Sequence, residues 1–223
     1  MSDQVGNESV PPVIGRPFPE SPMEVVEALL KRPQQVIRLA EVAEPQRLIG
    51  LALALLISAG VYGVVLGTFS GGVQFWAAPV KLIAGIIGSA VVCLPGLYMA
   101  ACLSGRDVKV RAVAGYLLAA VALSTLLLLG AAPAAWLFSV STHSLAGMGM
   151  VHLLIWGVGT CAGLRLLIRA LGGMRGHLAL WCLMFVLVCV QMTTTLRPLL
   201  GTSDRLLTYE KKFFVEHWWD CIR

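Results

Sequence analysis

Long apolar stretches separated by short polar segments dominate the hydrophobic pattern of this chain. The most apolar stretch runs from Trp76 to Leu103 and holds one formal charge, Lys81. About 20 apolar residues, each rising ~1.5 Å, cross the hydrocarbon core of a bilayer, so this stretch is long enough to span a membrane. The pattern predicts five such spans: Leu48–Phe69, Ala77–Leu103, Val110–Gly130, Ala146–Leu171 and Leu178–Leu200.

Proline and polar residues divide the chain around these spans. Pro133 is expected to break the helical pattern after the third span. The following Ala131–Val140 segment then either extends that span obliquely or forms a re-entrant piece. Residues 1–20 are rich in proline and are expected to form a flexible arm. The predicted fold class is all-α, a polytopic membrane bundle of about five transmembrane helices over residues 47–201.

An amphipathic helix is expected at each end of this bundle. In residues 21–46, Ser21 and Pro22 are typical of the first residues of a helix. Met23, Val26 and Leu30 share one face of that helix. This region either lies on an anionic membrane surface or packs against the membrane domain. Residues 202–223 form an amphipathic interfacial tail, which lies on the outer leaflet or docks against a partner. Its expected interfacial anchors are aromatic: Phe213, Phe214, Trp218 and Trp219.

The distribution of charge supports a membrane protein and sets its orientation. Charged residues make up 13% of the chain, about half the ~25% of a typical soluble domain. The net charge of +5 comes from basic residues at the ends of apolar segments, which argues against a nucleic-acid partner. Basic residues occur in every second connecting segment, so the positive-inside rule places the N-terminus in the cytoplasm. Five spans then place the C-terminus outside, and the basic residues of the tail leave a C-terminal re-entry as the alternative.

A polar cluster is predicted where the fifth span ends. The cluster consists of Gln191, Thr194 and Arg197, which are spaced three residues apart and therefore share roughly one helical face. This face is expected to pack against the bundle and not to contact lipid. Lys81 is predicted at the same membrane depth, so these residues are candidates for an anion-favouring site. None of the predicted spans contains Asp or Glu, which argues against a proton-coupled transporter.

Small residues four apart suggest where helices approach closely. Gly63 and Gly67 form a GxxxG motif in the first span, and Gly159 and Gly163 form one in the fourth. Such faces pack helices within one chain or between copies of a chain, and both alternatives stay open.

No motif for catalysis, cofactor binding or metal binding occurs. The sequence lacks HExxH, GxSxG, P-loop and CxxC patterns, so we expect no enzyme activity, no cofactor and no metal site. His152, near the outer start of the fourth span, is the one residue that suggests an alternative. A lone histidine in a span could ligate a haem or chlorin, although no second histidine stands at a matching depth.

Two runs of residues resemble those of a known family. The first run resembles the second span of an uncharacterised family of bacterial multi-span membrane proteins. It consists of Lys81, Cys93-Leu94-Pro95-Gly96-Leu97-Tyr98 and Leu103-Ser104-Gly105. The second run resembles the end of the last span of that family, and it consists of Gln191-Met192 and Leu196-Arg197-Pro198-Leu199-Leu200-Gly201. The resemblance covers roughly residues 48–216, with Val80, Gly96 and Leu199 departing from the family pattern. It implies a bacterial inner-membrane location, makes Pro95 and Tyr98 candidate interaction residues, and transfers no activity.

A looser resemblance, carried by the Pro-x-Leu-Tyr run at Pro95, is to Yip-type five-span membrane proteins, which implies a membrane-organising adaptor. The expected function is therefore that of a non-enzymatic structural or accessory subunit, or scaffold, of a membrane protein complex. Its expected partners are the lipid bilayer and other integral membrane proteins or further copies of the chain. The alternative is a small transporter or channel that uses Lys81, Gln191 and Arg197.

Overall fold

The structure, a computed structural model, describes residues 22–32, 35–37, 40, 45–70, 72–105, 108–141, 145–173 and 176–195. These residues form helices joined by turns, and no strand occurs among them. The helices are α1 (Pro22–Lys31), α3 (Pro45–Ser70), α4 (Gln74–Leu103), α5 (Val110–Ser141), α6 (Leu145–Ala170) and α7 (Gly176–Thr195). The predicted all-α fold class is confirmed.

Four of the helices are long and apolar enough to cross a membrane. Their spanning segments are Pro45–Phe69, Phe75–Leu103, Val110–Ser141 and Gly147–Ala170, close to the first four predicted spans. The apolar part of α7, Gly176–Met192, is shorter. Apolar helices of this length satisfy every backbone group internally, as hydrocarbon requires, and they indicate a membrane-embedded protein.

Pro133 does not break the third span, contrary to the prediction. Helix α5 runs without interruption from Val110 to Ser141 with Pro133 inside it, and α4 likewise contains Pro79 and Pro95. Proline removes one backbone hydrogen bond, but leaving the helix inside hydrocarbon would expose many more unpaired groups, so spanning helices tolerate it. The segment Ala131–Val140 therefore continues the helix and forms no re-entrant piece.

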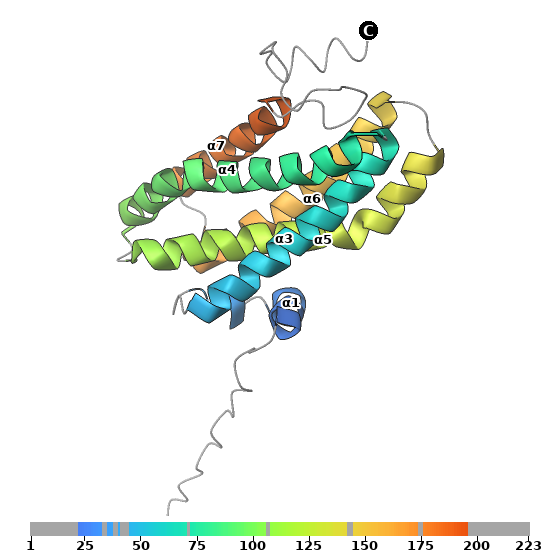
Figure 1. The fold of residues 1–223 in the computed structure, drawn as a ribbon. Helices are drawn as coiled ribbons and strands as arrows, with labels where there is room; N and C mark the ends of the chain where they lie inside the picture. Colours follow the sequence, from blue (N-terminus) through green and yellow to red (C-terminus); the bar gives the residue numbers. More distant parts are fainter. Residues whose placement is uncertain are drawn as a thin grey trace, which may run out of the picture.

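Helix α5 occupies the centre of the described bundle. It packs against α3 and α6 and also contacts α4, while α3 and α4 pack as a helical hairpin turning at Gly72 and Val73. Helix α7 packs along α4, as Figure 1 shows. Because α5 has neighbours on several sides, it buries a larger share of its apolar stretch than the other spanning helices. The other helices must therefore expose apolar residues.

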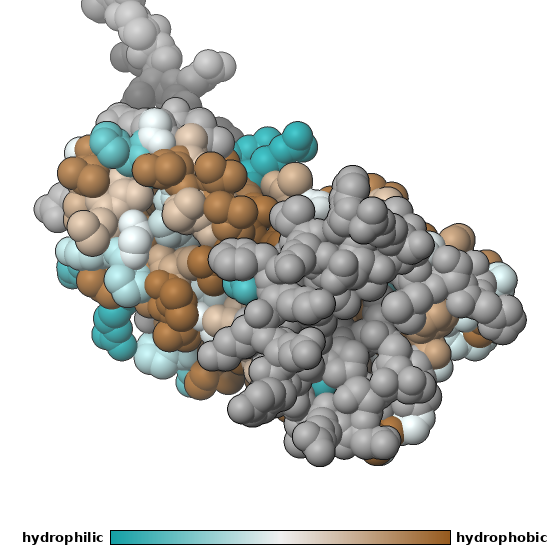
Figure 2. Space-filling model, turned by 90° about the horizontal axis from the view of Figure 1, so that it is seen from above, coloured by the Kyte–Doolittle hydropathy of each residue, from teal (hydrophilic) through white to brown (hydrophobic). Residues whose placement is uncertain are grey.

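Large apolar side chains cover the outside of the bundle. Examples are Ile57 and Val61 on α3, Val91 on α4, Val158 on α6 and Leu180 on α7, all exposed. Figure 2 shows brown apolar residues over much of the described surface in that view. Water would disfavour such a surface, whereas lipid tails accept it, so the surface agrees with membrane embedding. Aromatic Trp76 and Trp136 are also exposed, near one end of α4 and α5.

Helix α1 lies outside the long helices, at the end of the bundle where α3 begins (Figure 1). It buries Val25, Ala28 and Leu29, and the Val25 methyl group sits against Gly50 of α3. Of the predicted apolar face, Val26 is partly buried against the core, whereas Met23 and Leu30 are exposed. Met23 is 76% exposed and Leu30 is 54% exposed. Because Val26 lies between Leu29 and Leu30 around the helix, α1 carries one wide apolar stripe, which is buried along the flank of Leu29 and exposed along the flank of Met23 and Leu30.

The predicted GxxxG motifs serve packing within the chain. Gly63 of α3 lies directly against the Pro79 backbone of α4, with no room for a Cβ. A Cβ at Gly159 of α6 would lie 2.9 Å from the Ser124 backbone oxygen of α5. Gly163 of α6 sits against the Ala120 backbone in the same way. Glycines at these positions let helix backbones approach closely, which is the main source of packing energy between helices in lipid.

Candidate functional site: a buried tyrosine–histidine pair

A tyrosine and a histidine meet inside the described bundle. The hydroxyl oxygen of Tyr62, on α3, lies 2.7 Å from Nδ1 of His152, on α6. The two rings meet edge to face, with centroids 5.6 Å apart. Tyr62 is 2% exposed and His152 is 8% exposed. Two polar side chains that are distant in sequence are thus held together away from lipid.

Small residues of α5 make room for this pair. Ala132 and Ala135 are buried in the apolar cluster that contains Tyr62, and their short side chains let α3 and α6 reach one another past α5. Helix α4 closes the cluster, because Gly63 admits the Pro79 backbone next to Tyr62. Four helices therefore meet at the pair. The other members of the cluster are apolar: Val65, Leu66, Ala78, Leu82, Leu128 and Ile155.

The second ring nitrogen of His152 is the unusual atom of the site. His152 Nε2 is buried, and it has no hydrogen-bond partner in the part of the chain that the structure describes. Most buried polar atoms are hydrogen-bonded, and leaving one unpaired costs about 1–3 kcal/mol. The Tyr62–His152 pair can therefore offer one further hydrogen bond to a molecule inside the bundle.

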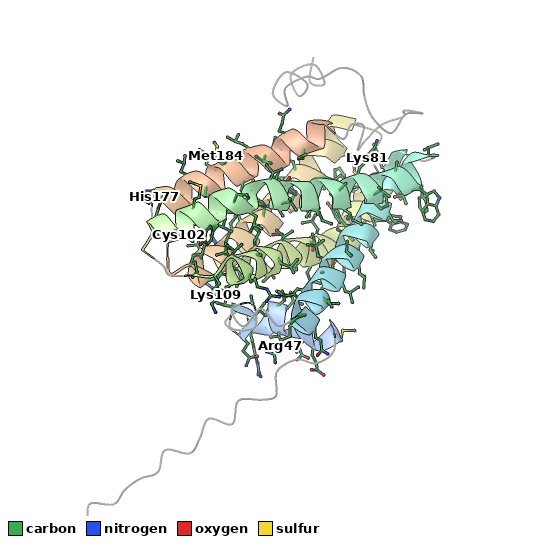
Figure 3. The ribbon with its side chains drawn as sticks, turned by 60° about the vertical axis from the view of Figure 1, so that its left-hand side comes forward. Arg47, Lys81, Cys102, Lys109, His177 and Met184 are labelled. Atoms are coloured by element: carbon green, nitrogen blue, oxygen red, sulfur yellow. The ribbon has the colours of Figure 1, made fainter. Side chains whose placement is uncertain are left out.

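Lys81 lies on α4 at the opposite end of the bundle from Arg47 and Lys109 (Figure 3). Its side chain is 4% exposed, so it is covered by protein and does not extend along a lipid-facing surface. Ala78, one turn earlier on α4, is fully buried in the cluster around Tyr62. Lys81 is thus a buried basic residue near the end of the bundle where Trp76 is exposed.

The predicted cluster at the end of the fifth span is only partly described. Gln191 of α7 is exposed, contrary to the expectation that its face meets the bundle. The contact with α4 is made instead by its neighbour Met192, whose methyl group lies against Gly88. Gly88 is two helical turns, about 10 Å, beyond Lys81 along α4. Thr194 lies in the last turn of α7, and Arg197 lies outside the described residues.

Pro95 lies where α7 docks on α4. Trp181 of α7 donates a hydrogen bond from Nε1 to the backbone oxygen of Cys93, at 2.9 Å, and its ring rests on Gly96. The Trp181 ring also stacks on Phe185, with centroids 5.2 Å apart. A Cβ added at Gly96 would lie 3.4 Å from the indole Cδ1, an ordinary van der Waals contact, so this position marks where the two helices touch. The neighbouring Tyr98 is half-buried against the main apolar core.

The remaining sequence predictions concern metals and anchors. Cys93, Cys102, Cys161, Cys182 and Cys189 are free. Among the residues that the structure describes, no group of three or more side chains is placed to hold a metal ion. The predicted arm of residues 1–20 and the tail of residues 202–223 lie outside the described residues, and so do the predicted anchors: Phe213, Phe214, Trp218 and Trp219.

Sequence analysis singled out His152 but missed Tyr62 and Trp181. Each of the two missed residues carries one polar group on an apolar ring, and such a group needs a partner when it is buried in a span. That requirement was a usable signal for Tyr62, since a tyrosine well inside an apolar stretch points into a bundle, whereas Trp181 lies near the start of the fifth predicted span. It could not identify the partners, which are 90 and 88 residues away along the chain.

Comparisons of the chain with family models, with curated proteins and with solved structures find no match. The resemblance of the Lys81, Pro95 and Arg197 runs to a bacterial membrane family therefore stays a prediction. The fold and the site define a class of protein. The chain is an all-helical protein with four apolar helices long enough to cross a membrane, and a tyrosine–histidine pair lies buried among them.

Proposed function

We propose that this protein is a non-enzymatic accessory subunit or scaffold of a membrane protein complex, located in a bacterial inner membrane. In this proposal α7 is the fifth span, because its 20 residues extend about 30 Å, the thickness of the hydrocarbon core. The N-terminus is cytoplasmic in this proposal, since basic residues gather at the α1 end: the half-buried Arg47 and the exposed Lys109, Arg111 and Arg169.

The half-exposed apolar stripe of helix α1 is the observation that carries this proposal. One flank of the stripe, with Val25 and Leu29, fixes α1 to the bundle, and the other flank presents Met23 and Leu30. Exposed apolar residues on a helix that is anchored outside the membrane spans mark a contact surface. Helix α1 packs on α3, where Ile49 is also exposed, so a membrane partner can contact both helices. The proposed partner is a second integral membrane protein that covers this face.

Replacing Met23 and Leu30 together by glutamate is expected to remove the partner. The bundle itself should remain folded, because neither side chain contributes to the buried face of α1. The measurement is affinity purification of the tagged full-length chain from its native membrane in mild detergent, followed by mass determination. Wild-type protein should bring down a fixed partner at constant stoichiometry, and the double variant should lose at least ~90% of it, because burying two unpaired charges costs several kcal/mol.

A matched control is available on the same helix. Glu27 and Lys31 form an exposed ion pair at 3.0 Å, and such pairs contribute little energy. Replacing both by glutamine should leave the partner bound. Recovery of the wild-type chain alone would contradict the subunit proposal. The second candidate function, an anion-favouring transporter or channel, would then be favoured by the burial of Lys81 at membrane depth.

A further inference from the structure

We propose that the Tyr62–His152 pair is a binding site for a neutral oxygen atom, of water or of a lipid ester carbonyl, which accepts a hydrogen bond from His152 Nε2. The inference is independent of the accessory-subunit function. It rests on the 2.7 Å contact of Nδ1 with the Tyr62 hydroxyl and on the buried, unpaired Nε2.

The hydrogen-bond arithmetic of the pair decides which ring nitrogen carries the proton. A neutral histidine has one N–H donor and one acceptor nitrogen. If Nδ1 carried the proton, it would donate to the Tyr62 oxygen, and both the tyrosine proton and the Nε2 lone pair would need other partners. If Nε2 carries the proton, Tyr62 donates to Nδ1 and only the Nε2–H group lacks a partner. The second arrangement leaves fewer unpaired groups, so we assign the proton to Nε2.

This assignment determines the chemistry of the ligand. A protonated Nε2 has no lone pair for a metal, which removes the haem or chlorin alternative for His152 in this state. What it can bind is a hydrogen-bond acceptor. The cluster around Tyr62 consists of apolar side chains such as Leu66, Ala78 and Leu128, so a neutral acceptor costs less to bury beside them than an anion does. We therefore assign a neutral oxygen atom as the partner of Nε2.

Two sources supply such an oxygen at this depth. His152 lies seven residues after the start of α6, about 10 Å from the end of that helix. A buried water molecule can accept this hydrogen bond, and so can the ester carbonyl groups of membrane lipids, which lie at the hydrocarbon boundary. Both offer the same acceptor chemistry to Nε2–H. In either case, His152 is hydrogen-bonded to a molecule that is not part of the chain.

Solid-state NMR of the full chain tests the site directly. The protein carries 13C- and 15N-labelled histidine and is reconstituted in phosphatidylcholine with 13C at its ester carbonyls. The proposal predicts a proton on Nε2 of His152, none on Nδ1, and a through-space correlation from the Nε2 proton to water or to the lipid carbonyl carbon. A water correlation and a carbonyl correlation distinguish the two sources, and each supports the site.

Two results would overturn the proposal. One is an Nε2 without a proton, and the other is an Nε2 proton whose only correlation is to another side chain of this chain. His177, exposed at the start of α7, provides an internal reference that exchanges with bulk water. The Tyr62→Phe variant should mix the two proton positions and reduce the correlation at least ~3-fold, since a lost buried bond is worth ~0.6 kcal/mol or more. Tyr98→Phe should leave the His152 signals unchanged.

Discussion

Replacing Gly163 by alanine should destabilise the bundle by about 1–3 kcal/mol, the usual cost of forcing extra volume into a packed interior. A Cβ at this position would overlap the Ala120 backbone oxygen and the Ser124 hydroxyl of α5. The Ser124 side chain can rotate, but the Ala120 backbone is part of a continuous helix and cannot move alone. Helices α5 and α6 must therefore separate, and the packing between them is lost.

Thermal unfolding of the purified protein in detergent or nanodiscs measures this effect, as a lower midpoint for the variant. Gly157→Ala is the matched control, because Gly157 lies on the same helix with nothing within 4 Å of its Cβ position. It should be neutral or slightly stabilising, since alanine favours the helix over glycine by up to ~1 kcal/mol. Equal effects at Gly157 and Gly163 would show that the α5–α6 contact is not as close as described.

Trp181→Ala should release α7 from α4 and have the larger effect of the two. The indole is buried on Gly96, stacks on Phe185 and donates to the Cys93 oxygen. Large-to-alanine changes of buried aromatic residues cost about 3–5 kcal/mol, mostly through lost packing. Helix α7 depends strongly on this residue because α4 is its main neighbour among the described helices.

Limited proteolysis of the segment between α6 and α7, together with thermal unfolding, would report the released helix. Trp181→Phe keeps much of the ring and loses the hydrogen bond, so it should cost about 1 kcal/mol from that bond, plus a smaller packing loss. Leu180→Ala is the neighbouring control, because Leu180 is 61% exposed on the same helix. A Trp181→Ala protein as stable as the Leu180→Ala protein would contradict the assigned docking contact.

Sequence reasoning predicted the helices well because length and hydrophobicity in spanning segments are set by the membrane. It failed at Pro133, where the rule for water-exposed helices did not apply, since a break would expose backbone groups to hydrocarbon. It predicted an apolar face on α1 from Met23, Val26 and Leu30, but periodicity cannot show which flank of that face meets the bundle.

The site could not be predicted in the same way. His152 was noticed as a polar residue in a span, but its partner Tyr62 belongs to another helix, and only the fold brings the two rings together. The small residues that permit this meeting, Ala132 and Ala135, resemble ordinary helix formers in the sequence. The predicted cluster of Lys81 with Gln191 rested on equal depth, and the register of α4 with α7 separates these residues by about two turns.

In the proposed topology, the α1 end of the membrane-embedded bundle faces the cytoplasm. The most direct test is labelling of single-cysteine variants with a membrane-impermeant maleimide in intact cells, with the native cysteines replaced by alanine. Val73 and Lys109 are both exposed and lie at opposite ends of α4 and its following turn. The account predicts that Val73→Cys is labelled in intact cells and that Lys109→Cys is labelled only after permeabilisation. Labelling of both positions in intact cells, or the reverse pattern, would contradict it.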